Sequence, residues 1–144
     1  MQSAVASIQR AISRAVSKRR EIQAAYVFGS TATGRTRPDS DVDVAVLLGR
    51  PLRTRHVLDY RLKLTTDLGA ALHRSDVDVV ILNDAPTLLA HRILSKGKLV
   101  FERSASVRVR FQVRIARLYA DLVPLLETHI RYLKQQAREG RAGG

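Results

Sequence analysis

The chain of 144 residues contains no cysteine and no tryptophan, and aromatic side chains make up only 5% of it. The absence of cysteine excludes a disulfide scaffold, a thiolate metal site and a cysteine nucleophile, and it is typical of proteins of the cytoplasm. No apolar run approaches the roughly 20 residues that span a membrane, and the first residues lack the apolar segment of a secretory signal. The four histidines lack the spacing of metal ligands, so we expect structural or surface roles for them.

Acidic residues are also scarce. Thirteen Asp and Glu stand against 25 Lys and Arg, which gives a net charge of +12. Such a charge attracts nucleoside triphosphates, nucleic acids or an acidic protein partner, and it does not choose among them. The basic residues are dispersed, without a basic tail or interleaved aromatic residues, so a solvated surface and a binding face both stay open. Direct binding to nucleic acid is the less favoured interpretation.

The length fits one domain, and we expect residues 1–144 to form a single domain. Apolar periodicity predicts helices at residues 3–20, 53–73, 87–95 and 104–138, and strands at residues 24–28, 41–48, 76–82 and 98–102. Pro124 is expected to kink or divide the last helix. This order predicts an α/β fold, a mixed sheet of about four strands with helices on one face and a long C-terminal helix.

Small, polar and acidic residues are most concentrated between two expected strands. This segment, from Gly29 to Asp43, reads G-S-T-A-T-G-R-T-R-P-D-S-D-V-D and is the candidate catalytic loop. Residues two apart on a strand share a face, so Asp41 and Asp43 should project together. Their mutual repulsion favours a cation between them, and oxygen ligands suit Mg²⁺. Gly29 lets the backbone approach a ligand, and the Ser30 hydroxyl with nearby N–H groups can hold phosphate. The run predicts a nucleotide site; a hairpin loop with a solvated acidic edge is the structural alternative.

A second pair of acidic residues, Asp76 and Asp78, begins the strand D-V-D-V-V-I-L. Asp78 is expected deeper in this apolar strand, where a carboxylate is costly without a cation or a hydrogen-bond donor. We therefore expect Asp78 to share the metal of Asp41 and Asp43. Asp76 stands at the extreme start of the strand, where it is expected to end the preceding loop.

The run Gly29-Ser30, Thr31 to Ser40 and Asp41-x-Asp43 matches the G-S-x10-D-x-D signature of the DNA polymerase β-like nucleotidyltransferase superfamily. From Tyr26 to the C-terminal helix the chain resembles its minimal nucleotidyltransferase (MNT) branch. The resemblance implies a polymerase β-like core and places the family's third carboxylate at Asp78. It implies ATP as substrate and two Mg²⁺ ions, with the phosphates at Gly29 and Ser30 and the metal at Asp41, Asp43 and Asp78.

Within that branch the chain resembles the MNT antitoxins of HEPN/MNT toxin–antitoxin pairs. These proteins transfer AMP from ATP to a tyrosine of the HEPN ribonuclease toxin and so silence it, which implies a HEPN toxin as partner. Two alternatives stay open: a binding-only antitoxin that covers its toxin, and a nucleic-acid-binding module that uses the positive charge. The sequence does not decide whether Arg35 or Arg37 contacts the triphosphate.

Overall fold

The computed structural model describes residues 4–33 and 41–142 of the chain. The elements are α1 (Ala4–Ser17), β1 (Ile22–Phe28), α2 (Ser30–Thr33), β2 (Val42–Leu48), α3 (Thr54–Leu72), β3 (Val77–Ile81), the 3-10 helix η1 (Leu82–Asp84), α4 (Thr87–Lys96), β4 (Lys98–Glu102) and α5 (Ala105–Ala142). The four expected strands and the four expected helices are present. The short helix α2 is an addition, because a single turn is too short to produce an apolar period in the sequence.

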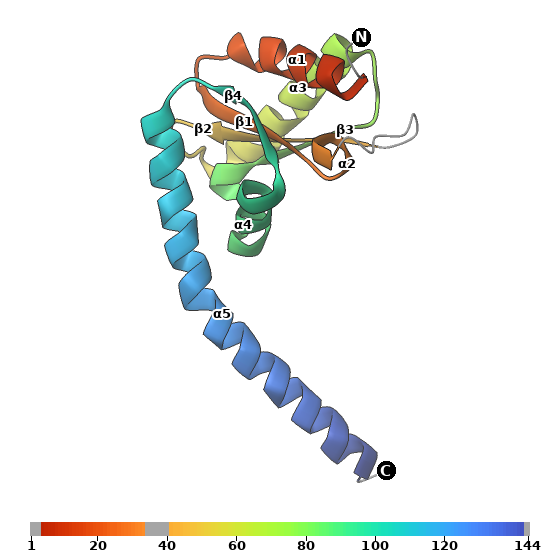
Figure 1. Cartoon of the computed structure of the whole chain (residues 1–144), viewed down its shortest axis with the longest axis vertical. Helices are drawn as coiled ribbons and strands as arrows, with labels where there is room; N and C mark the ends of the chain where they lie inside the picture. Colours follow the sequence, from red (N-terminus) through yellow and green to blue (C-terminus); the bar gives the residue numbers. More distant parts are fainter. Residues whose placement is uncertain (1–3, 34–40, 143–144) are drawn as a thin grey trace.

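The four strands, which are labelled in Figure 1, form one mixed sheet in the order β3-β2-β1-β4. β1 is antiparallel to β2 and to β4, whereas β2 and β3 are parallel and are joined through α3. A parallel pair needs such a crossover because the chain must return to the same end of the sheet. The starts of β2 and β3 and the end of β1 therefore meet at one end of the sheet.

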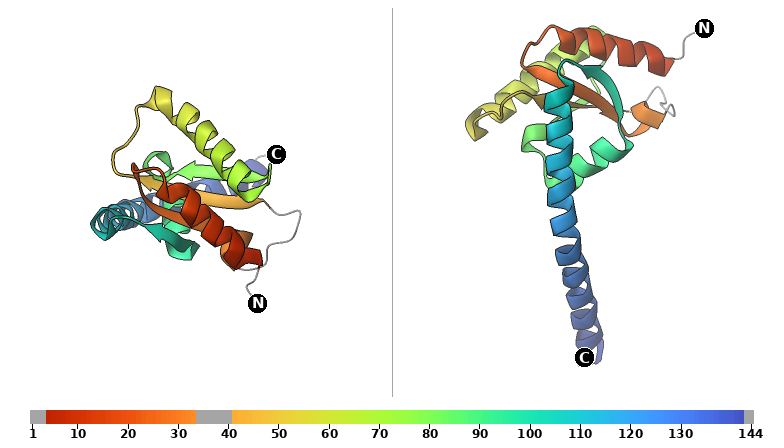
Figure 2. Two further views of the ribbon diagram at one scale, coloured as in Figure 1. Left: turned by 90° about the horizontal axis from the view of Figure 1, so that it is seen from above. Right: turned by 60° about the vertical axis from the view of Figure 1, so that its left-hand side comes forward.

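Helices cover both faces of this sheet (Figure 2). Val44 and Val46 of β2 belong to the core that α1 and α3 complete. The alternate residues Ala45 and Leu47 pack instead with residues of α4 and α5. The expectation of helices on one face is therefore wrong. The reason is that both alternating sets of β2 side chains are apolar, so each face has to be buried against a helix.

α5 is a continuous helix of 38 residues that extends away from the sheet (Figures 1 and 2). Its first turns pack on the sheet and α4 through Phe111 and Ile115. Pro124 lies inside the helix without dividing it, because proline removes one N–H donor and the exposed surroundings leave water to solvate the freed carbonyl. We call residues 122–142 the helical arm. No helix within the described residues is long and apolar enough to cross a membrane.

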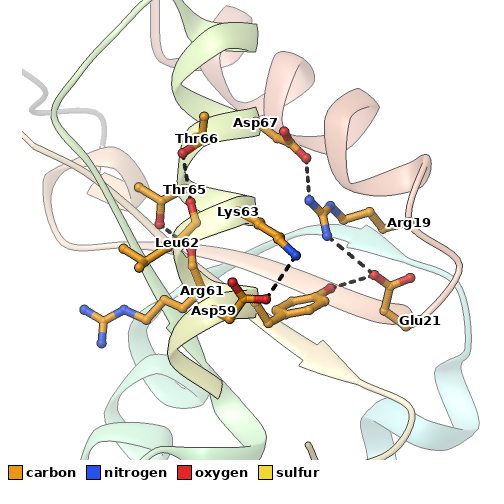
Figure 3. Close-up of polar contacts among 10 residues, drawn as sticks. Arg19, Glu21, Asp59, Arg61, Leu62, Lys63, Thr65, Thr66 and Asp67 are labelled. Carbon is orange, nitrogen blue, oxygen red and sulfur yellow. Dashed lines mark hydrogen bonds and ion pairs between the residues drawn. The ribbon is translucent and has the colours of Figure 1, made fainter. Parts of the chain in front are cut away.

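A polar cluster ties the turn after α1 to α3 (Figure 3). Arg19 forms ion pairs with Asp67 and, at 3.7 Å, with Glu21, and its guanidinium carbon lies 5.3 Å from the ring centre of Tyr60. The Tyr60 hydroxyl donates a hydrogen bond of 2.9 Å to Glu21 Oε1. Burial and then this carboxylate raise the pKa of Tyr60. The cluster fixes the position of α3, whose Arg61 side chain points away from it (Figure 3).

Candidate active site

Three aspartates meet at the end of the sheet where β2 and β3 begin. Asp43 and Asp78 are direct partners in the parallel pairing of these strands. Both lie on the face covered by α4, since Ala45 and Val80, two residues further along each strand, pack there. Asp41 is exposed at the residue before β2, and its charge acts on Asp43. The structure thus brings together the three aspartates that the sequence analysis named.

The electrostatics of Asp43 reflect this crowding. Partial burial of the carboxyl group raises the pKa of Asp43 above its usual value, and repulsion from Asp78 and then from Asp41 raises it further. Such a cluster of like charges favours a bound cation. Within the described residues, Arg61 meets part of this need, because its Nη2 atom lies 3.6 Å from Asp78 Oδ1.

Asp78 is more accessible than the apolar strand suggests. Its side chain is 56% exposed, so the expectation of a carboxylate deep in the strand is wrong. The reason is that β3 is an edge strand, which leaves Asp78 at the open margin of the sheet. Asp76 belongs to a different interaction: its carboxylate accepts hydrogen bonds of 2.7 and 2.5 Å from the Arg74 guanidinium, which lowers the pKa of Asp76.

Gly29 follows the last residue of β1 and lies directly against the Asp43 carboxylate. Its φ of +64° lies in the left-handed region, which L-residues with a side chain rarely adopt. A Cβ atom at this position would stand 2.6 Å from Asp43 Oδ2. Both the backbone and the contact therefore require glycine here. Ser30 follows as the first residue of α2. Arg35 and Arg37 lie outside the described residues.

A cleft of about 440 Å³ opens beside Gly29 and Asp43, and we call it the first cleft. α4 contributes two cations to its wall, Arg92 and Lys96. These residues are four positions apart and so lie on the same side of the helix. The sequence analysis did not predict a role for these two cations. Their spacing of four residues, in the helix that follows the strand of Asp78, could have indicated that both face the site. Apolar residues complete the wall: Phe28, Leu89 and Ile93.

The donor atoms at the three aspartates suit magnesium. Among residues 4–33 and 41–142, no group of three acidic, histidine or cysteine side chains is arranged to enclose a metal ion, so the aspartates would have to turn toward it. The fit rests on their chemistry, because carboxylates supply the hard oxygen ligands that Mg²⁺ prefers. A cation would also relieve the repulsion that raises the pKa of Asp43. Asp41, Asp43 and Asp78 are therefore the residues that would hold Mg²⁺.

Residues 10–106 match the sequence profile of a family described as polymerase beta, nucleotidyltransferase. The chain therefore belongs to the polymerase β nucleotidyltransferase family, and the expected fold class is confirmed. The protein adenylyltransferase MntA of Shewanella oneidensis is 32% identical over 102 residues, which cover 71% of this chain and 69% of MntA. The protein adenylyltransferase MntA of Aphanizomenon flos-aquae is 23% identical over 135 residues, which cover 90% of each protein.

The fold of the chain is also similar to that of chains in solved toxin–antitoxin structures. The crystal structure of a toxin–antitoxin with AMP-PNP contains a chain that superposes with a TM-score of 0.73 at 27% identity, over 87% of this chain and 97% of that one. A structure of tri-AMPylated Shewanella oneidensis HEPN toxin in complex with MNT antitoxin gives a TM-score of 0.69 at 25% identity, over 90% and 98% of the two chains. The resemblance to the MNT antitoxins is confirmed.

Proposed function

We propose that this chain is a Mg²⁺-dependent protein adenylyltransferase that transfers AMP from ATP to a tyrosine of a HEPN toxin and thereby neutralises it. The observation that carries the proposal is the pairing of Asp43 with Asp78, beside Gly29 and a cleft that contains two cations. The relatives support the substrates, since one toxin–antitoxin complex holds AMP-PNP and another contains a tri-AMPylated HEPN toxin. In this proposal residues 1–144 act as one nucleotidyltransferase domain in the cytoplasm.

The first cleft is the proposed site for the triphosphate of ATP. The backbone at Gly29 and the Ser30 hydroxyl hold phosphate oxygens, for which the absence of a Cβ at Gly29 leaves room. Arg92 and Lys96 offset the negative charge of the phosphates from α4. The cleft volume of about 440 Å³ falls in the range of small-molecule sites.

The three aspartates have the complementary task. Asp41, Asp43 and Asp78 would hold magnesium, two ions in this proposal, and its charge would relieve the repulsion that raises the pKa of Asp43. Bound magnesium supplies charge neutralisation for the pyrophosphate leaving group and activates the attacking hydroxyl. Asp78, at the open edge of the sheet, is accessible to the hydroxyl of an incoming protein and is the proposed acceptor of its proton. The chain itself thus contributes placement and charge.

The helical arm supports a protein partner. Leu125 is 67% exposed, and Tyr132 and Leu133 are 55% and 49% exposed, although all three would normally be buried. Leu125 and Tyr132 are seven residues apart, so they share one side of the helix. Exposed apolar side chains along a projecting helix are typical of a surface that another protein covers. The net charge of +12 favours an acidic surface on that partner and disfavours a second copy of this chain.

The experiment that tests the proposal uses ATP labelled at the α-phosphate, Mg²⁺ and the product of any HEPN gene adjacent to the gene for this chain. The double variant Asp41→Asn/Asp43→Asn removes two metal carboxylates. Asp59→Asn is the matched control, because Asp59 is an exposed residue of α3 that forms an ion pair with Lys63 at the surface. We expect label on the HEPN protein with the wild type and with Asp59→Asn, and none with the double variant.

Two outcomes would replace the proposal. An unlabelled HEPN protein that is still bound and neutralised by the chain would establish a binding-only antitoxin. Binding of RNA or DNA with a steep salt dependence, and no transfer, would instead favour a nucleic-acid-binding module, because phosphate contacts release counterions.

A further inference from the structure

A second cleft, of about 280 Å³, lies between α3, β3 and the start of α4. It shares Leu89 with the first cleft, so the two are neighbours. Arg61 and Asp84 are the charged residues that line it. The rest of its wall is apolar: Val57 of α3, Val80 and Ile81 of β3, Ala85 and Pro86 just before α4, and Leu89 of α4. The proposed handling of ATP makes no use of this second cleft.

The second cleft lies next to the third carboxylate. Arg61 lines the cleft and is also the partner of Asp78, at 3.6 Å. Val80 lines it too, two residues after Asp78 on the same face of β3. The side chain of Arg61 points away from the polar cluster that anchors α3, as Figure 3 shows. The first cleft reaches Asp43, and the second is lined by Arg61, the partner of Asp78, so the two clefts approach the paired aspartates from different sides.

We propose that the second cleft is the acceptor site, which holds the side chain of a tyrosine from the partner protein during AMP transfer. This inference rests on the proposed function and adds the place on this chain where the acceptor tyrosine binds. An aromatic ring suits the wall formed by Val57, Val80 and Pro86, because burying it there removes apolar surface from water. Its hydroxyl then lies toward Arg61 and Asp78. Serine and threonine are too short to fill the apolar wall.

The transfer step is balanced with the groups at hand. The phenolic oxygen attacks the α-phosphorus of ATP in the first cleft and forms the new P–O bond. The bond from the α-phosphorus to the oxygen that bridges to the β-phosphate breaks, and pyrophosphate leaves with that bonding pair. The phenolic proton passes to the Asp78 carboxylate and from there to water. Arg61, a positioning residue, holds Asp78 and places a positive charge beside the phenol, which favours its deprotonated form.

The test uses the full chain with its HEPN partner and compares two adjacent residues of α3. Val57→Trp fills the second cleft, whereas Leu58→Trp adds the same side chain at a position that is 62% exposed and absent from the walls of both clefts. Label transfer from α-labelled ATP and the affinity for AMP-PNP are measured for each variant. We expect Val57→Trp to lose transfer by about tenfold or more, with AMP-PNP affinity within about twofold of the wild type. Leu58→Trp should change neither quantity.

Arg61 provides a second test. Its side chain is half-exposed, so replacing it does not disturb the packing of the core as a tryptophan at position 57 can. Arg61→Ala should lower the transfer rate at saturating ATP by about tenfold and leave the KM for ATP unchanged. Arg61→Lys should restore much of that rate, since it keeps the positive charge. A residue with only a structural role would affect thermal stability and would not show this rescue.

The outcomes separate this inference from the proposed function. Normal transfer by Val57→Trp and by Arg61→Ala would overturn the acceptor site and leave the adenylyltransferase proposal intact. Loss of AMP-PNP binding in Val57→Trp would overturn it as well, because the second cleft would then hold part of the nucleotide. Absence of transfer by the wild type under the same conditions would remove the proposed function, and the acceptor site with it.

Discussion

Replacing Gly29 by alanine perturbs the site through one methyl group. The φ of +64° costs a residue with a side chain roughly 1–2 kcal/mol, and the added Cβ would stand 2.6 Å from Asp43 Oδ2. The backbone cost predicts a fall in Tm of about 3 to 8 °C for a domain of this size. The contact can be relieved only if Asp43 moves, and a displacement of about 1 Å in a catalytic group costs about 10²-fold in rate. We therefore expect Gly29→Ala to fold and to transfer AMP about 10²-fold more slowly.

Gly49→Ala is the matched control, since its Cβ would stand 3.4 Å from Gln23 Nε2, at the end of a flexible side chain, and its φ lies outside the left-handed region. Thermal melts and labelled transfer to the HEPN partner measure the two effects separately. Gly29→Ala with a lowered Tm and an undiminished rate would refute the argument that the Gly29 contact positions Asp43. Equal losses of rate in both variants would refute it too.

Three further predictions concern the cations, the carboxylate and the helical arm. Arg92→Ala and Lys96→Ala should each raise the KM for ATP about tenfold, as expected for the loss of one charge-assisted contact. The control Lys63→Ala, at an exposed position, should leave the KM unchanged. An unaltered KM in both Arg92→Ala and Lys96→Ala would exclude the first cleft as the triphosphate site. In EDTA at pH 7, Asp43→Asn should raise Tm, because burial and repulsion penalise the ionised carboxylate of the folded state. That penalty is relieved as pH falls through the raised pKa of Asp43 toward its ordinary value of 3.8, so the gain in Tm from Asp43→Asn should vanish at low pH. Saturating Mg²⁺ at pH 7 should reverse the gain. A gain in Tm that is independent of pH would contradict this reasoning. Leu125→Asp should weaken the complex with the HEPN protein about tenfold or more in a calorimetric titration, with AMP-PNP binding unchanged; undiminished affinity would show that the helical arm lies outside the interface.

The sequence predicted β2 and the position of Asp41 and Asp43 at its start well, because alternation is a local property. The second expected strand, residues 41–48, differs from β2 by one residue, because Asp41 lies just before Val42. The pairing of Asp43 with Asp78 is different in kind, since it depends on the register of two strands separated by a helix. The resemblance to known nucleotidyltransferases pointed to Asp78, whereas the spacing alone left it beside Asp76.

Long-range packing accounts for what the sequence did not predict. Arg92 and Lys96 enter the site only because α4 folds back beside the end of β1, and no local pattern gives that position. The cover on both faces was missed because alternation along β2 does not show on which side of the sheet each helix packs. Asp78 was expected to be buried because the apolar strand around it does not show that β3 lies at the edge of the sheet.

The most direct measurement is the intact mass of the HEPN protein isolated after co-expression with this chain or with its Asp43→Asn variant. With the wild type, the HEPN protein should carry the mass of one or more AMP units and be inactive as a toxin. With Asp43→Asn, it should form the complex and carry no added mass. An unmodified HEPN protein that the wild type nevertheless silences would contradict AMP transfer as the function of the paired aspartates.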